Sequence, residues 1–108
     1  MATSRIAALQ EILTREPNDV TTHYMLGNEY FKAQMYDQAV ATLRRYLALA
    51  DDQGAVYRML ALSLLRLGKL DEARQAYRDE LAAATRHGHQ PMIQEYTQAL
   101  KHLDEDLD

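Results

Sequence analysis

Apolar residues recur along the chain at intervals of three and four positions, and the pattern breaks at regular distances. In residues 20–53 the apolar positions Leu26 and Tyr30 follow helical spacing, and a second stripe begins at Ala39 after a pause. Residues 54–87 show the same stripe, break and new stripe. Such spacing places apolar side chains on one face of a helix. Since no run alternates between apolar and polar residues as a strand would, we expect an all-α chain.

The two segments align with each other without a gap, in a register of 34 residues. Eight of the aligned pairs are identical, and tiny residues align at Gly27 and Ala61. A tiny residue lets two helix axes approach closely where they cross, so each copy is predicted to be a pair of antiparallel helices crossing there. Met25 and Met59 also recur at one position of the repeat, which favours a place in the core.

The residues around each break resemble the signature of the tetratricopeptide repeat. Residues 37–40 (DQAV), their copy at 71–74 (DEAR) and the run 24–30 (YMLGNEY) carry the resemblance. It implies a short right-handed solenoid of stacked antiparallel helix pairs that holds another protein on its concave face. Gln34 stands where this family favours glycine, so we expect the first inter-helix turn to be less tight.

The predicted organisation is a single domain of about six helices over residues 1–108, since about three repeats are needed for a stable stack. Its parts are an N-terminal half-repeat helix (3–16), a first repeat (20–53), a second repeat (54–87), a C-terminal capping helix (90–105) and an acidic frayed tail (104–108). The first helix lacks a partner helix, so one flank of Ile6, Leu9 or Leu13 is expected to be uncovered.

Side chains of the first helix of each repeat that lie outside the core stripe are predicted to line the concave face. They combine apolar, polar and basic groups: Tyr24, Asn28, Phe31, Lys32, Arg58, Leu62, Leu65 and Arg66. Because an apolar patch with a polar rim is typical of a binding surface, we expect a short segment or helix of another protein to bind there. Two alternatives stay open. Phe31 and Leu65 could merely pack between neighbouring helices while the last helix covers the groove, or the chain could form a homodimer through its terminal half-repeats.

Charge and hydropathy narrow the list of partners. Four of the 16 acidic residues lie in the last five positions, which leaves 12 acidic and 12 basic residues in the rest of the chain. A neutral body has no long-range attraction to a phosphate backbone, so nucleic acid is not expected as a partner. No apolar run is long enough to cross a membrane, and the N-terminus lacks the pattern of a signal peptide. We therefore expect no membrane partner and a cytoplasmic location.

Candidate chemistry is sparse. His87, His89 and His102 invite a metal site, but the histidines beside Gly88 are expected to be exposed, and zinc requires three or four convergent ligands. No phosphate-binding loop or nucleophile motif is present, so we expect no enzymatic activity, no cofactor and no metal. A solvated outer face with ion pairs along the second helices is predicted for Arg44, Arg45, Arg74, Arg78, Asp79 and Glu80.

Overall fold

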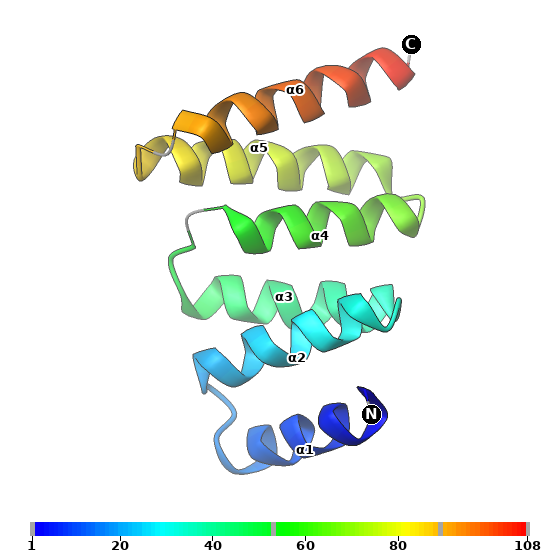
Figure 1. The fold of residues 1–108 in the computed structure, drawn as a ribbon, viewed down its shortest axis with the longest axis vertical. Coiled ribbons are helices and arrows are strands. Elements are labelled where there is room, and N and C mark those ends of the chain that lie inside the picture. Colours follow the sequence, from blue (N-terminus) through cyan, green and yellow to red (C-terminus); the bar gives the residue numbers. More distant parts are fainter. Residues whose placement is uncertain (1, 53, 89, 108) are drawn as a thin grey trace. The chain divides into compact units, whose positions relative to one another are not determined.

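The computed structural model describes residues 2–52, 54–88 and 90–107, and the regular structure within this part is helical throughout. Its helices are α1 (Ala2–Arg15), α2 (Val20–Lys32), α3 (Tyr36–Leu49), α4 (Ala55–Arg66), α5 (Leu70–Arg86) and α6 (Gln90–Leu107). Within each half of the chain, consecutive helices run in opposite directions (Figure 1). The predicted all-α fold of antiparallel helix pairs is confirmed.

Residues 1–51 and 52–108 form two compact units. In the first unit α2 is the central helix and packs against both α1 and α3. In the second unit α5 is central and packs against both α4 and α6. The division between the units falls beside the predicted junction of the two repeats. Whether the two units pack together as the predicted single domain of residues 1–108 stays a prediction.

The core of each unit is built around a close helix crossing. Gly27 on α2 faces Leu43 on α3, and a Cβ atom added to Gly27 would lie only 2.6 Å from Leu43 Cδ2. Ala39, also on α3, is fully buried. In the second unit Ala61 and Ala73, the corresponding small residues of α4 and α5, are fully buried too. The crossings predicted from the tiny residues are therefore present, because a larger side chain would push the axes apart.

Aspartates begin the first helix of each repeat. The Asp19 carboxylate accepts a hydrogen bond from the amide of Thr22 at 3.2 Å and caps α2. The Asp52 carboxylate accepts from the amides of Gly54 and Val56 at 2.7 and 3.1 Å, at the start of α4. Both contacts satisfy amides that have no carbonyl partner within the helix. Asp52 therefore has a turn and capping role.

The turn between α2 and α3 differs from the expectation. Gln34 has a backbone φ of +61°, close to the +75° of Gly68 in the turn between α4 and α5. In both turns the next amide donates to the carbonyl five residues earlier at 2.9 Å. The prediction of a less tight turn at Gln34 was therefore wrong. Glutamine adopts the left-handed conformation there, at an energetic cost that glycine avoids.

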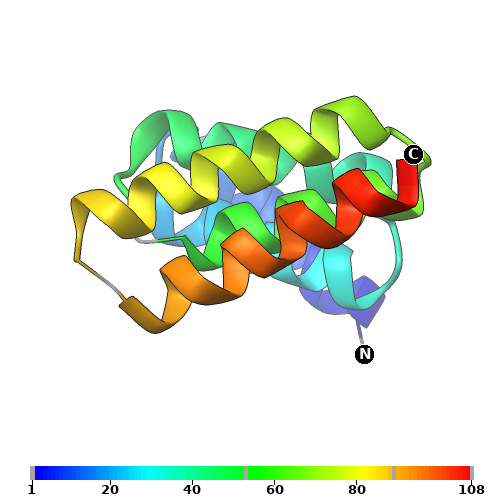
Figure 2. The same cartoon turned by 90° about the horizontal axis from the view of Figure 1, so that it is seen from above.

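The terminal helices lie close to their predicted bounds, and their assignment as half-repeats stays a prediction. α1 begins and ends one residue earlier than predicted, and α6 extends to Leu107 rather than to residue 105. Figure 2 shows α6 beside α5, running in the opposite direction. Asp108 lies outside the described residues, and fraying of the acidic tail stays a prediction. No helix in the described part of the chain is long and apolar enough to cross a membrane.

Candidate functional site

In the first unit, the predicted binding residues lie along α2. Tyr24 is 39% exposed, and its ring is 5.7 Å from the ring of Tyr46 on α3. Phe31 is half-buried and meets Tyr36 edge to face, with ring centroids 6.1 Å apart. Asn28 is half-buried. Tyr24 thus offers an aromatic surface to solvent, whereas much of Phe31 is engaged in packing between helices.

Met25 was wrongly predicted to lie in the core. Its exposed fraction is 44%, while its repeat counterpart Met59 is half-buried. Met25 precedes the buried Leu26 by one residue, and one step along a helix rotates a side chain about 100° away from the core stripe. Met25 therefore adds a flexible apolar side chain to the exposed surface beside Tyr24. The recurrence of methionine at one repeat position therefore does not show whether that position is buried or exposed.

Lys32, one of the predicted binding residues, is already paired inside the unit. The carboxylate of Glu29, a nearly buried residue of α2, lies 3.1 Å from Arg5 Nη1 and 3.4 Å from Lys32 Nζ. The hydrogen bond from Arg5 holds the pKa of Glu29 below its usual 4.5, with a further lowering by Lys32 and an opposing effect of burial. Glu29 thus remains ionised and ties α1 to α2.

In the second unit, the predicted binding residues lie along α4. Leu62 and Leu65 are half-buried, and Arg66 is exposed. Arg58 Nη1 lies 2.5 Å from Glu95 Oε1 of α6, and the two side chains are 54% and 46% exposed. Arg58, one of the predicted binding residues, is therefore bound to a carboxylate of the same chain. Sequence spacing could not pair Arg58 with Glu95, because 37 positions and a whole helix separate them.

The prediction of a solvated position for Glu80 was wrong, since Glu80 is fully buried on α5. This helix is covered on two sides, by α4 and by α6, so a residue one turn from the buried Tyr77 is enclosed. Burial raises the pKa of Tyr77, as do the charges of Glu80 and Glu95, whereas Arg58 lowers it. Charged side chains from α4, α5 and α6 thus act on Tyr77 and form a charged cluster around it.

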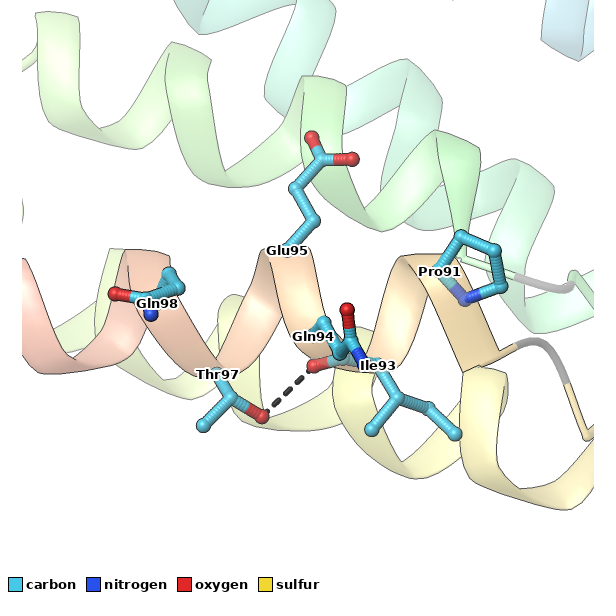
Figure 3. A pocket seen from close by; sticks show the side chains of 6 residues that line it. All are labelled: Pro91, Ile93, Gln94, Glu95, Thr97 and Gln98. Carbon is cyan, nitrogen blue, oxygen red and sulfur yellow. Dashed lines mark hydrogen bonds between the residues drawn. The ribbon is translucent and has the colours of Figure 1, made fainter.

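Outside this charged cluster the second unit carries little candidate chemistry. Figure 3 shows an open hollow of about 470 Å³ along α6, lined by Pro91, Ile93, Gln94, Glu95, Thr97 and Gln98. Glu95 projects from one side of the helix, and Ile93 and Thr97 from the other. His87 and His102 are exposed, and His89 lies outside the described residues. Within the described part, no three histidine, aspartate or glutamate side chains form a metal-binding group.

The predicted site residues fall into two sets of four. The set on α2 belongs to the first unit and the set on α4 to the second, and within each set the side chains follow one helix. A groove that joins the two sets stays a prediction. The alternative that the last helix covers part of the surface gains support within the second unit, where α6 reaches Arg58 through Glu95.

Known proteins share both the sequence pattern and the fold. The TPR repeat-containing protein PA0015 of Pseudomonas aeruginosa is 28% identical over 99 residues, which cover 92% of this chain and 94% of that protein. The solution structure of protein BPP2914 from Bordetella parapertussis is 26% identical and superimposes with a TM-score of 0.76, covering 94% of this chain and 88% of that one. A MamA structure (AMB-1) is 25% identical with a TM-score of 0.70, over 94% of this chain and 61% of that one.

The family described as anaphase-promoting complex, cyclosome, subunit 3 matches residues 2–80, which include α1, both helices of the first repeat and most of the second repeat. These findings agree with the 34-residue register and with the close crossing at Gly27. The chain belongs to this family and is a tetratricopeptide repeat protein, a helical-repeat module of the kind that generally serves protein interaction without catalysis.

Proposed function

We propose that the chain is an adaptor that binds a short segment or helix of another protein along the first helices of its repeats. The observation that carries the proposal is the exposed apolar surface of Tyr24 and Met25 on α2. Half-buried Leu62 and Leu65 offer a second apolar surface on α4. Helical repeat proteins use such surfaces to bury the side chains of a partner, while polar neighbours fix its register.

The same observations shape the kind of partner that we propose. Lys32 and Arg58 are each paired with a carboxylate of the chain itself, so charge adds little long-range attraction for nucleic acid. Binding would therefore depend on apolar contacts and on exchange of ion pairs. We propose that the chain acts in the cytoplasm, as a binding module rather than an enzyme, with no cofactor, no metal and no membrane partner.

A peptide selected from a random phage-displayed library on the intact chain provides the test. Leu62→Glu should weaken binding of this peptide at least tenfold, because it places a charge where apolar side chains would be buried. Leu49→Glu is the matched control, since Leu49 is an exposed leucine on the second helix of the first repeat. Circular dichroism must show unchanged helicity for both variants. Equal loss of affinity in both variants, or in neither, would refute the proposed surface.

Self-association is a second candidate function, favoured by the outer side of α1. Ile6 and Leu9 are buried, whereas Ile12 and Leu13 remain half-exposed on a helix that has only α2 as a neighbour within its unit. An open hollow of about 350 Å³ lies beside Ile12. Another copy could cover these side chains. Sedimentation velocity at several concentrations decides the matter, because a chain that stays monomeric throughout does not self-associate.

A further inference from the structure

Arg58 obtains its counter-charge from a helix that is not its direct neighbour. Within the second unit α4 and α6 each pack on α5, and the described residues of α4 and α6 make no close backbone approach to each other. The side chains of Arg58 and Glu95 nevertheless meet at 2.5 Å and bridge the two helices. An arginine at this place is suited to receive a carboxylate from any helix lying against α5.

The two repeats differ at this position in a way that explains the bridge. Alignment of the repeats places Tyr24 opposite Arg58 and Tyr46 opposite Glu80. In the first unit the two tyrosine rings contact each other, 5.7 Å apart, so the position is filled from within the repeat. In the second unit the position is charged, and Arg58 reaches a carboxylate contributed by the following helix. The second repeat thus carries a carboxylate receptor that the first repeat lacks.

The helix that fills this receptor packs on α5 and meets α4 through an exposed ion pair. Among the described side chains of α6 only Leu103 is buried. Ile93, Ala99 and Leu100 are half-exposed, and the ion pair to Arg58 is about half-exposed on both sides. An exposed ion pair contributes at most a few-fold to an equilibrium. Another helix with the same pattern of apolar and acidic residues can therefore compete with α6 for Arg58.

We propose that α6 is an internal ligand and that a partner's amphipathic helix displaces it by presenting a carboxylate to Arg58. This inference rests on the proposed adaptor function and adds to it the chemistry of the partner and a means of regulation. The partner helix carries an acidic residue between apolar residues, as Glu95 lies between Ile93 and Leu100. Binding of the partner helix displaces α6 from its place on α5. While α6 is docked it occupies Arg58, so the partner binds only when its helix is present at sufficient concentration.

A synthetic peptide with the sequence of residues 90–107 serves as the probe, labelled with a fluorophore and titrated with the intact chain. In Glu95→Gln protein the internal helix loses its ion pair, so the peptide should bind about two- to fivefold more tightly than to the wild-type protein. Arg58→Gln added to that variant should remove the gain. Arg66→Gln is the matched control, because Arg66 is another exposed arginine on α4, and it should leave the gain intact.

Hydrogen exchange measured on the intact chain supplies a second readout. Saturating peptide should accelerate exchange of the backbone amides of the chain's own α6 and leave those of α2 unchanged. A peptide with Gln in place of Glu95 should bind wild-type and Glu95→Gln protein about two- to fivefold more weakly than the unchanged peptide does, because it offers Arg58 no carboxylate. The proposal is overturned if the peptide binds no variant at millimolar concentration, if Glu95→Gln gives no gain, or if α6 becomes better protected.

Failure of this proposal is distinguishable from failure of the adaptor function. If the library peptide still binds in a manner that depends on Leu62 while the α6 peptide does not compete with α6, the adaptor function stands and the internal-ligand role is wrong. If the library yields no Leu62-dependent peptide but the α6 peptide binds through Arg58, the proposed apolar surface is wrong and the carboxylate receptor remains.

Discussion

The crossing of α2 and α3 at Gly27 allows a quantitative prediction. Gly27→Ala adds a methyl group whose carbon would lie 2.6 Å from Leu43 Cδ2 and 3.1 Å from Leu43 Cγ. The optimal separation of two carbon atoms is about 3.5–4.0 Å, so both contacts are strongly repulsive. Leu43 is fully buried, and buried side chains are close-packed, so a change of its rotamer is costly. Either the Leu43 side chain must turn within its packed surroundings or the helices must move apart at their crossing.

Two opposing effects decide the sign of this change. Alanine is favoured over glycine within a helix by about 1 kcal/mol. Overpacking of a filled core costs about 1–3 kcal/mol, and the close approach to a buried leucine places Gly27 near the upper value. The balance is a loss of about 2 kcal/mol in the free energy of unfolding. A glycine-to-alanine change inside a helix is thus predicted to destabilise the protein, against the helix propensity.

Urea denaturation followed by circular dichroism measures the loss, and amide exchange of α2 and α3 locates it in the first unit. Ala41→Gly is the matched control, because Ala41 is exposed on α3 and reports the helix propensity alone, a loss of about 1 kcal/mol. In a Leu43→Val background the clashing Cδ2 atom is absent although γ carbons remain, so the loss caused by Gly27→Ala should be smaller than in the wild-type background. A Gly27→Ala protein at least as stable as the wild type would show that the crossing of α2 and α3 accommodates the added methyl group.

Three further changes probe the local structure. Gln34→Gly should stabilise the first unit by about 1 kcal/mol in urea denaturation, because glycine adopts the positive φ of +61° without strain, and a loss of stability would contradict the assigned turn. Asp19→Ala should cost about 1 kcal/mol in the same assay by leaving the amide of Thr22 without its cap, whereas Asp19→Asn should cost less. The pKa of Glu29 is lowered in the folded chain, so its contribution to stability is complete above the ordinary value of 4.5 and is lost as the pH falls through the lower folded value. Arg5→Gln should reduce this loss below pH 4.5 and shift the carboxyl titration of Glu29 upward in NMR spectra, and an unchanged titration would disprove the pairing.

The positions that the sequence could predict were those fixed by local pattern. Gly27, Leu26 and Tyr30 were placed correctly on the crossing and in the core, because tiny and large residues recur at helical spacing. These features depend on neighbours within one helix pair, which the 34-residue register brings together.

The prediction for Glu80 was wrong, and the pairing of Arg58 was not predicted, because a third helix determines the surroundings of these side chains. Glu80 was predicted to face solvent beside other charged residues, but α6 and α4 together enclose α5. Arg58 was predicted to be available to a partner, but Glu95 of α6 reaches it. Met25 failed for a different reason, since repetition of a residue type reports a shared environment without saying whether that environment is buried. The spacing of apolar residues therefore identified the faces of each helix, but it did not show which other helix covers each face.

Chemical-shift mapping tests whether the first helices of the repeats bind another protein. The library-selected peptide is titrated into isotopically labelled intact chain, and the shifts of all backbone amides are followed. We predict that the largest changes in chemical shift lie on α2 and α4, around Tyr24, Met25 and Leu62. Changes confined to the second helices α3 and α5, around exposed residues such as Leu49 and Arg78, would contradict it.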